Sequence, residues 1–492
     1  MESTGADRVP DYGVWVRDGS NKSAQKNVLV ADLDGSLIKT DLLIESFLSY
    51  IKTGLTAFLA VIAWLMKGKA ELKWQLARKI FFNPENLPYN QMVLDHLKSE
   101  KAKGRYLVLA SASNSLLVES VARYLDIFDE VVSSSGKNLS GVNKAELLVE
   151  RYGRWGFEYI GNSNDDVPVW KSSAGAVIVS SSSGMAKSLA ERSKVKVVSE
   201  IVSKPPLSAW IRAIRLHQWL KNMLVFVPLF ASHRVFDWSS ASNSMLAFLL
   251  FGLCASSIYI LNDFLDLQED RSHRSKKKRA FASGELMIMD GVKLLLFMVG
   301  VVAAVLYLMS NLWLAVVVLV YLVSTTLYSF WLKRVMMADV VVLAALYTIR
   351  IVAGGVATGV ALSMWLLAFS VFAFCGLALL KRYGEFSDGG GKFSGRGYQS
   401  SDTPILAALG SGASFGSVMV LVLYINDPVT ASMYSRPECI WATIPLLLYW
   451  FGRVWILAGR GLVNDDPVLF AAKDRVSILC FLLTLISFFV AL

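Results

Sequence analysis

From about residue 210 to its end, the chain consists mostly of long apolar runs separated by short polar loops. A helix needs about 20 apolar residues to cross a bilayer, because each residue advances it by only about 1.5 Å. The windows that approach this length are 222–236, 244–265, 290–308, 312–332, 337–359, 364–380, 405–425, 440–458 and 476–492. This pattern predicts an all-α polytopic membrane domain of about nine transmembrane helices over residues 210–492.

The Lys and Arg residues of this region test the helix count independently. They gather in the loops after the second, fourth, sixth and eighth windows, whereas the opposite loops carry little beyond Arg234 and Arg436. Cytoplasmic loops are enriched in these residues. The distribution therefore predicts a multi-pass protein of the cell inner (plasma) membrane with its N-terminal domain in the cytoplasm. The basic residues assigned to cytoplasmic loops are Arg271, Arg274, 276–279, Lys333, Arg334, Lys381, Arg382, Lys392, Arg396, Arg460, Lys473 and Arg475.

The first 200 residues differ in composition from the rest. The whole chain is 54% hydrophobic and 18% charged, yet its long apolar runs are nearly all in the second part. The N-terminus has no basic segment followed by an apolar core, so it does not resemble a signal peptide. We predict a tail over residues 1–26, an α/β domain over 27–198 and a linker over 199–209.

Two function classes are disfavoured by composition. The net charge of +10 fits basic membrane-flanking loops, and no basic stripe interleaved with aromatic residues indicates a nucleic-acid partner. The four cysteines lie far apart without a CxxC pair, which argues against a zinc site or a disulfide framework.

Polar residues follow the apolar strands predicted in the α/β domain. The run 28–31 ends in Asp32 and Asp34, and the run 106–110 ends in Ser111. Acids at the carboxyl end of a buried parallel strand stand where α/β folds place ligand-binding groups. Further along, Lys144 lies in a helix-like segment, and a third strand near residue 160 leads into GNSNDD, residues 161–166.

In this order the pieces resemble the haloacid dehalogenase superfamily, which has a Rossmann-like fold and consists mostly of phosphatases. The resemblance implies that Asp32 is the nucleophile, that Asp34 is the general acid and base, and that Ser111 and Lys144 hold the phosphoryl group. It also implies Mg²⁺ at Asp32, at the Asp34 carbonyl and at the last motif, through Asn162 and Asp166. That family usually has an acid where this chain has Asn162, so Mg²⁺ affinity should fall unless Asp165 or Asp166 compensates.

The alternative interpretation is a degenerate domain kept for docking or stability. The apolar run 54–66 is too short to span a membrane. We interpret it as a helix of a small cap, with a face that could touch the membrane surface.

An acidic stripe follows the apolar run 245–261. Asp263, Asp266 and Asp270 are spaced by three and four residues, so on a helix their carboxylates return to one face. Like charges side by side near a bilayer are costly, and a divalent cation would offset the repulsion. Mg²⁺ commonly bridges one or two carboxylates to the phosphates of a substrate. The alternative is a solvated acidic helix end before a basic loop that includes Arg279.

With Asn262, this stretch resembles the first signature of the UbiA superfamily of membrane prenyltransferases, NDxxDxxxD followed by a basic segment. The resemblance implies that the acids bind Mg²⁺, which holds the diphosphate of an activated donor. Arg274 and Ala280 stand where that family often has Pro, which predicts a less rigid loop.

Three further polar clusters flank the predicted helices. The alternative for the first is an interfacial anchor with membrane-surface charge, and the alternative for the last is a charge block that stops transfer across the membrane. An Arg at the depth of Arg350 rarely faces lipid, and it pairs with an acid or lines a polar cavity. Asp339 lies 11 residues earlier on the same helix face. The clusters comprise Arg215, Gln218, Lys221 and Asn222; Tyr328, Lys333, Asp339 and Arg350; and Lys381 and Arg382.

The RxxQWxKN spacing of the first cluster and the KRY of the last are similar to the polyprenyl-phosphate phosphoribosyltransferase branch of that superfamily. The resemblance implies an isoprenoid lipid acceptor and phosphoribosyl diphosphate as donor, with Asp263, Asp266 and Lys381 in catalytic roles and the other cluster residues binding substrate. Such a product keeps a 5′-phosphate, which a phosphatase on the same chain could remove. The alternatives are prenyl transfer from a polyprenyl diphosphate to an aromatic acceptor, as in quinone biosynthesis, and a non-enzymatic lipid-binding or transport protein.

Overall fold

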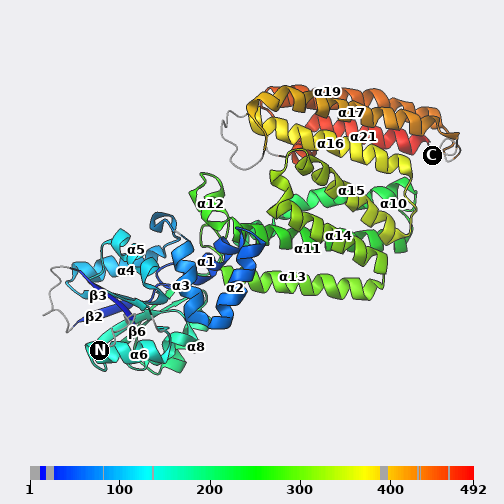
Figure 1. The fold of residues 1–492 in the computed structure, drawn as a ribbon. Coiled ribbons are helices and arrows are strands. Elements are labelled where there is room, and N and C mark those ends of the chain that lie inside the picture. The colour runs from blue at the N-terminus through cyan, green and yellow to red at the C-terminus, as the bar shows by residue number, and fades with distance from the viewer. Residues whose placement is uncertain are drawn as a thin grey trace, which may run out of the picture. The chain divides into compact units, whose positions relative to one another are not determined.

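The computed structural model describes residues 12–17, 27–80, 82–135, 138–387, 397–428, 432, 434–463 and 466–491 (Figure 1). The chain divides into two compact units. The first comprises Met1–Ile214 and Tyr259–Leu296, and the second comprises Arg215–Ile258 and Phe297–Leu492. Residues 1–11 and 18–26 of the predicted tail, and the basic residues Lys392 and Arg396, lie outside the described residues.

The first unit is built on a seven-stranded sheet in the order β1-β4-β3-β2-β5-β6-β7. Strand β1 is antiparallel to β4, and the other pairs are parallel. Chain order reverses at β2, which pairs with β3 on one side and β5 on the other. Such a switch point is where α/β sheets bind ligands. The strands are β1 Tyr12–Val16, β2 Val28–Ala31, β3 Tyr106–Asn114, β4 Glu130–Ser134, β5 Phe157–Gly161, β6 Gly175–Ser180 and β7 Val197–Val202.

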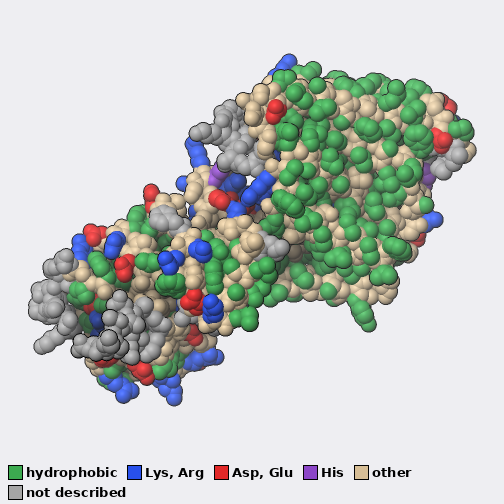
Figure 2. Space-filling model, viewed as in Figure 1, with side chains coloured by type: hydrophobic (Ala, Val, Ile, Leu, Met, Phe, Trp, Pro, Cys, Tyr) green, Lys and Arg blue, Asp and Glu red, His purple; other side chains and the backbone are tan. Residues whose placement is uncertain are grey.

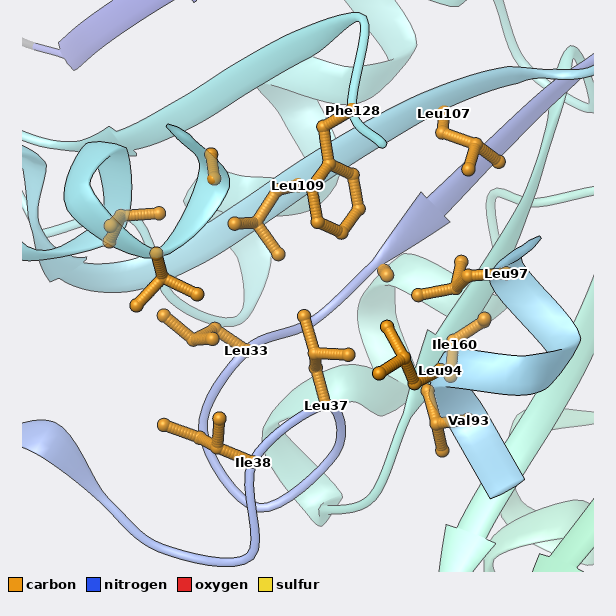
Figure 3. Close-up of a cluster of buried hydrophobic side chains, with 14 of the residues drawn as sticks. Leu33, Leu37, Ile38, Val93, Leu94, Leu97, Leu107, Leu109, Phe128 and Ile160 are labelled. Atoms are coloured by element: carbon orange, nitrogen blue, oxygen red, sulfur yellow. The ribbon is translucent and has the colours of Figure 1, made fainter. Parts of the chain in front are cut away.

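Strand β2 is buried on both faces, as its unbroken apolar sequence predicts. Successive side chains point to opposite faces, so Leu29 and Ala31 join one core whereas Val28 and Val30 join the other. Figure 3 shows part of the first core, in which Leu107 and Leu109 pack near Phe128. These two cores hold β2 rigidly, and its carboxyl end carries the acids Asp32 and Asp34.

Helices connect the strands, and three of them form a small cap after β2. In the cap, α2 packs against α1 and α3. The helices of this unit are α1 Leu42–Ile51, α2 Leu55–Lys67, α3 Lys69–Lys79, α4 Gln91–Ala102, α5 Ser115–Leu125, α6 Val142–Tyr152, α7 Val167–Trp170, α8 Ser183–Ser193, α9 Leu207–Ile214 and α12 Leu267–Ser272. Short 3₁₀ helices are η2 Pro84–Asn86, η3 Asn164–Asp166 and η5 Lys276–Lys278.

Three boundaries differ from the prediction. Tyr12–Val16 pairs with β4 as an edge strand, so this part of the predicted tail belongs to the sheet. Val197–Val202 forms β7, which pairs with β6. We predicted a linker from residue 199 because the sequence there is polar. Residues Tyr259–Leu296 belong to the first unit, although we predicted all of 210–492 as one membrane domain. The physical reason is that this segment folds back on α1 through buried contacts described below.

The second unit is helical, and α11 and α13 run from it into the first unit. Its face in Figure 2 is covered largely by hydrophobic side chains, as expected for a lipid-facing surface. The elements are η4 Leu216–Phe226, α10 Val227–Ala231, α11 Trp238–Leu265, α13 Ile288–Met309, α14 Leu312–Phe330, η6 Leu332–Arg334, α15 Ala338–Thr358, α16 Met364–Ser387, η7 Ser400–Asp402, α17 Thr403–Asn426, η8 Pro437–Ala442, α19 Thr443–Gly459, α20 Pro467–Lys473 and α21 Arg475–Ala491.

In the described part of the chain, seven helices are long and apolar enough to span a membrane. They correspond to seven of the nine predicted windows. Helices α20 and α21 meet the criterion only as a pair bent by 83°, which brings the number to eight at most. The window 222–236 instead forms η4 and the short α10, which ends before His233, a residue with a positive φ of 58°.

Close packing inside this unit depends on a glycine. A Cβ at Gly354 of α15 would lie 2.0 Å from the carbonyl oxygen of Val225. Only glycine therefore lets α15 approach η4 this closely, and the polar residues of η4 are brought against α15.

Candidate functional site

The polar residues predicted in the α/β domain converge at the carboxyl ends of β2, β3 and β5. Except for Ser111, which donates to Asp34, they line a cavity of about 310 Å³ together with residues of the cap. Asp32, Asp34, Lys144, Asn162 and Asp166 all contribute to its wall. The sequence motifs, which are up to 134 positions apart along the chain, are thus brought together by the parallel sheet.

A buried chain of hydrogen bonds connects Asp32 to Asp166. Lys144 Nζ donates to Asp32 Oδ1 at 2.7 Å and to the Tyr159 hydroxyl at 3.0 Å, and that hydroxyl donates to Asp166 Oδ1 at 2.7 Å. Burial raises the pKa of Asp32 to about 7, although the Lys144 charge opposes the rise. Burial would lower the pKa of Lys144, but Asp32 and Asp166 outweigh it and raise that pKa. Lys144 therefore supplies the positive charge at the centre of the site.

Asp34 is positioned from three directions. Its Oδ1 accepts from the Leu42 backbone at 2.9 Å, and its Oδ2 accepts from the hydroxyls of Ser111 at 3.1 Å and Ser113 at 2.7 Å. Burial, followed by the charge of Asp41, raises the pKa of Asp34 to about 6. A carboxyl group with such a pKa can exchange protons near neutral pH.

In the last motif, residues 161–166, Asp166 and Asn162 make different contacts. Asp166 Oδ2 accepts from Asn162 N, Ser163 N and Ser163 Oγ, each at 3.0 Å, so this oxygen is occupied in shaping the turn. The Asn162 amide lies over Gly35, where a Cβ would come within 2.2 Å of Nδ2. Gly35 also has a positive φ of 75°, which favours glycine. Asn162 is thus held beside the acids of β2.

The predicted acidic stripe crosses a break between two helices. Asp263 lies in the last turn of α11, Asp266 at the junction, and Asp270 in α12. The i to i+4 backbone bonds continue through the junction, from Asp266 N to Asn262 O at 2.9 Å and from Asp270 N to Asp266 O at 2.8 Å. The stripe therefore survives the break.

Two of these acids meet at one cation. Arg279 Nη1 donates to Asp263 Oδ1 at 3.2 Å and to Asp270 Oδ2 at 2.5 Å. Both carboxylates are almost fully buried, and burial raises the pKa of Asp270 although Arg279 opposes the rise. Two carboxylate oxygens thus converge on a single point that a positive charge occupies.

The third acid faces the cap of the same unit. Lys52, which follows α1, forms an ion pair of 2.7 Å with Asp266 and also bonds Glu269. Next to it, Arg271 of α12 forms a bidentate pair with Glu45 of α1, at 2.6 and 2.8 Å, and its Nε donates to the Ala282 carbonyl at 3.1 Å. The side chains of Arg271 and Glu45 are only 4% and 1% exposed. The cap and the acid-bearing segment are therefore joined by a buried ion pair.

The acidic side chains of the two sites suit a Mg²⁺ ion that binds together with the phosphates of a substrate. Among the described residues, no three carboxylate, imidazole or thiolate side chains form a ready metal cage. Mg²⁺ usually needs only one or two carboxylates beside substrate phosphates and water. The convergence of Asp263 and Asp270 fits that requirement, and at the β2 site Asp32 and Asn162 offer oxygen ligands on neighbouring strand ends.

The second unit contains a buried cationic cluster. Lys221 forms an ion pair with Asp466, whereas Arg350 donates to Asn222 Oδ1 at 2.8 Å and to the Tyr321 hydroxyl at 3.0 Å. The Nδ2 of Asn222 is buried and has no hydrogen-bond partner among the residues that the structure describes. Such orphaned donors are rare, and a bound oxygen-rich ligand would satisfy it.

A second network in this unit surrounds Arg382. Its guanidinium donates to Asp339 at 2.5 Å, to Glu385 at 2.7 and 2.8 Å, and to the Tyr328 hydroxyl at 3.1 Å. Asp339 also accepts from the Tyr398 hydroxyl at 2.7 Å. Asp339 therefore pairs with Arg382 and not with Arg350, its predicted neighbour along α15.

The remaining predicted residues lie close to these networks in the chain. Lys381 is the neighbour of Arg382 on α16, and Lys333 lies in η6, which contacts both α14 and α15. Arg215 precedes η4 with a positive φ of 53°, and its carbonyl accepts from the backbone of Gln218 at 2.8 Å.

Several site residues were missed in the sequence. The sequence pattern could have indicated Ser113, since alternate residues of a strand share a face and Ser111 lies two residues away. It could also have indicated Asp466, because an acid before Pro467 is a typical helix start. No pattern indicates Lys52 and Glu45, because their partners lie more than 200 residues away.

Comparisons with known proteins identify the family of the chain. The model of the UbiA prenyltransferase family matches residues 223–473. The uncharacterized protein y4nM of Sinorhizobium fredii is 35% identical over 460 residues, which cover 92% of this chain and 89% of y4nM. Nodulation protein NoeC of Azorhizobium caulinodans is 34% identical over 290 residues, covering 58% of this chain and 93% of NoeC. Decaprenyl-phosphate phosphoribosyltransferase of Mycobacterium tuberculosis is 35% identical over 198 residues, covering 38% of this chain and 64% of that enzyme. The chain therefore belongs to the UbiA prenyltransferase family and is a multi-pass membrane transferase.

Proposed function

We propose that the chain transfers a 5-phosphoribosyl group from phosphoribosyl diphosphate to a polyprenyl phosphate at the inner membrane. The observation that carries the proposal is the buried cluster of Lys221, Asn222 and Arg350, whose Asn222 amide has a donor without a partner in the described part of the chain. Buried cations and an orphaned donor in a membrane bundle favour a phosphate-bearing ligand. The similarity to decaprenyl-phosphate phosphoribosyltransferase favours this donor and acceptor within the family.

In the proposed reaction, the bond from ribose C1 to the diphosphate oxygen breaks, and a bond from C1 to an oxygen of the lipid phosphate forms. Asp263, Asp266 and Asp270 would hold Mg²⁺, with Asn262 and Arg279 beside them. Bound Mg²⁺ would stabilise the negative charge that grows on the leaving diphosphate. Lys381 and Arg382 would orient the phosphates, Lys as a point charge and Arg as a fork.

We further propose that the α/β domain is a phosphatase of the haloacid dehalogenase type that faces the cytoplasm. The Asp32 carboxylate would attack phosphorus, and the P–O bond to the substrate would break as Asp34 protonates the leaving oxygen. Water activated by Asp34 would then release phosphate from Asp32. Lys144, at 2.7 Å from Asp32, would offset the charge of the incoming phosphate. Since y4nM aligns with 92% of this chain, its similarity extends over parts of both units, so both kinds of unit occur together in a relative.

The first test supplies purified full-length protein and Mg²⁺ with labelled phosphoribosyl diphosphate and a polyprenyl phosphate. We expect label in the lipid phase, and we expect Asp263→Asn to lower the rate by at least about a hundredfold. In a parallel reaction, labelled prenyl diphosphate is offered with an aromatic acceptor. Transfer in that reaction alone would replace our proposal with aromatic prenylation. Transfer in neither reaction would favour a non-enzymatic lipid-binding role, and activity unchanged in Asp263→Asn would contradict the role of this acid.

The second test follows release of inorganic phosphate from the lipid product. We expect Asp32→Asn to leave transfer intact and to accumulate lipid that still carries the 5′-phosphate. Wild-type protein that accumulates the same phosphorylated lipid would contradict the proposed phosphatase.

A further inference from the structure

The cavity of the α/β domain has a polar floor and an apolar wall. Asp32, Asp34 and Lys144 form the floor, whereas Leu43 and Ile44 of α1 and residues 287–289 form part of the wall. Residues 287–289 have the sequence Met-Ile-Met and lead into α13. A site for small sugar phosphates has no need of such a wall, because those substrates expose hydroxyl groups that require hydrogen bonds.

The same wall segment leads directly into a candidate membrane span. Helix α13 begins at Ile288, and the run 294–309 contains no charged residue. The run starts five positions after Met289, which is about 8 Å along a helix. If α13 spans the bilayer, the cavity wall lies within about one and a half turns of the hydrocarbon.

The cap carries a second apolar surface. On α2, Ala57 and Val61 are buried, whereas the exposed residues Phe58, Leu59, Ile62, Leu65 and Met66 occupy one arc of the helix. An exposed apolar stripe of this kind marks a surface that contacts a membrane or another protein. Helix α2 packs on α1 and α3, which contribute Leu43, Ile44 and Lys73 to the cavity.

From these observations we infer that the phosphatase cavity takes the phosphomonoester of a lipid held in the bilayer. The apolar wall receives the first part of the lipid next to its head group, and the exposed stripe of α2 rests in the bilayer interface beside the cavity. The inference rests on the proposed phosphatase and names its substrate class. The lipid-linked product of the transferase, with its 5′-phosphate, belongs to that class.

The test compares two phosphomonoesters with full-length protein in phosphatidylcholine and phosphatidylglycerol vesicles. One is water-soluble p-nitrophenyl phosphate, and the other is the phosphoribosyl lipid made in the same vesicles. The variants are Met287→Gln with Met289→Gln in the wall, and Phe58→Ser with Ile62→Ser on α2. The matched control is Met92→Gln on α4, since Met92 is 48% exposed, Met289 is 50% exposed, and Met92 does not line the cavity.

We expect the ratio of kcat/KM for the lipid to that for the soluble ester to fall about tenfold in each double variant. We expect Met92→Gln to leave this ratio unchanged. Soluble ester hydrolysed by wild type, with a ratio unaffected by either double variant, would overturn the inference and leave the phosphatase standing. Hydrolysis of neither ester would overturn both. If the α2 variant changes the oligomeric state in detergent, the stripe contacts protein, and its assignment to the bilayer is wrong.

Discussion

The ion pair between Glu45 and Arg271 offers the sharpest test of how the acid-bearing segment is held. Glu45→Gln keeps the size of the side chain but removes its charge, and it turns an amide NH₂ toward the guanidinium. Because both side chains are at most 4% exposed, Arg271 would be left as an uncompensated buried charge. Breaking such a pair costs about 3–5 kcal/mol, a factor of roughly 100 to 5,000 in a local equilibrium.

Hydrogen exchange measured by mass spectrometry is the suitable assay, because it reports local opening of α12 without unfolding the membrane helices. We expect amides of Leu267–Ser272 to exchange at least about a hundredfold faster in Glu45→Gln. Glu285→Gln is the matched control. It breaks the pair between Arg212 and Glu285, whose side chains are 45% and 36% exposed, and such a pair contributes at most about 1 kcal/mol.

Equal exchange rates in the two variants would refute the reasoning. A second variant that replaces both Glu45 and Arg271 with Met should recover most of the lost protection, because no charge is then buried. Since Asp270 lies on α12, we also expect transferase activity to fall as these exchange rates rise. Activity should be lowest in Glu45→Gln and restored in part by the double replacement.

Three further predictions concern the two sites. Lys52→Ala should lower the Mg²⁺ concentration that half-saturates the transferase by about two- to fivefold, because Lys52 and the metal compete for Asp266. Isothermal titration with Mg²⁺ should show the same change in affinity. The control Lys52→Arg keeps the charge and should not show it. Gly35→Ala should lower phosphatase activity at least about tenfold while transfer continues, because its Cβ would clash with the Asn162 amide. Phosphate release and lipid labelling, measured on one sample, report the two activities separately. Phosphatase activity should fall as the pH drops through about 7, since protonated Asp32 is not a nucleophile. The pH at which activity is half-maximal should move lower as the Mg²⁺ concentration is raised. A midpoint that does not depend on Mg²⁺ would mean that another group titrates.

Much of the fold follows from local sequence patterns. The membrane helices could be predicted because the thickness of the bilayer requires a run of about 20 apolar residues in each spanning helix. The polar cluster around Asp32 could be predicted because parallel strands bring their carboxyl ends to one edge, whatever connects them. The window 222–236 was predicted less well, since a count of apolar residues does not detect the 3₁₀ conformation of η4.

The partners of the buried charges could not be predicted in this way. Asp339 and Arg350 share a helix face, yet Asp339 bonds Arg382 of α16 and Arg350 bonds Asn222 of η4. In the same way, the sequence alone placed Asp266 and Asp270 on a membrane helix end, whereas the structure packs their segment against the cap through Glu45. Periodicity records which face of a helix is polar, because that depends on neighbours three or four residues away. The partner a buried charge takes depends on contacts between segments distant in the chain, and these exist only once the tertiary structure has formed.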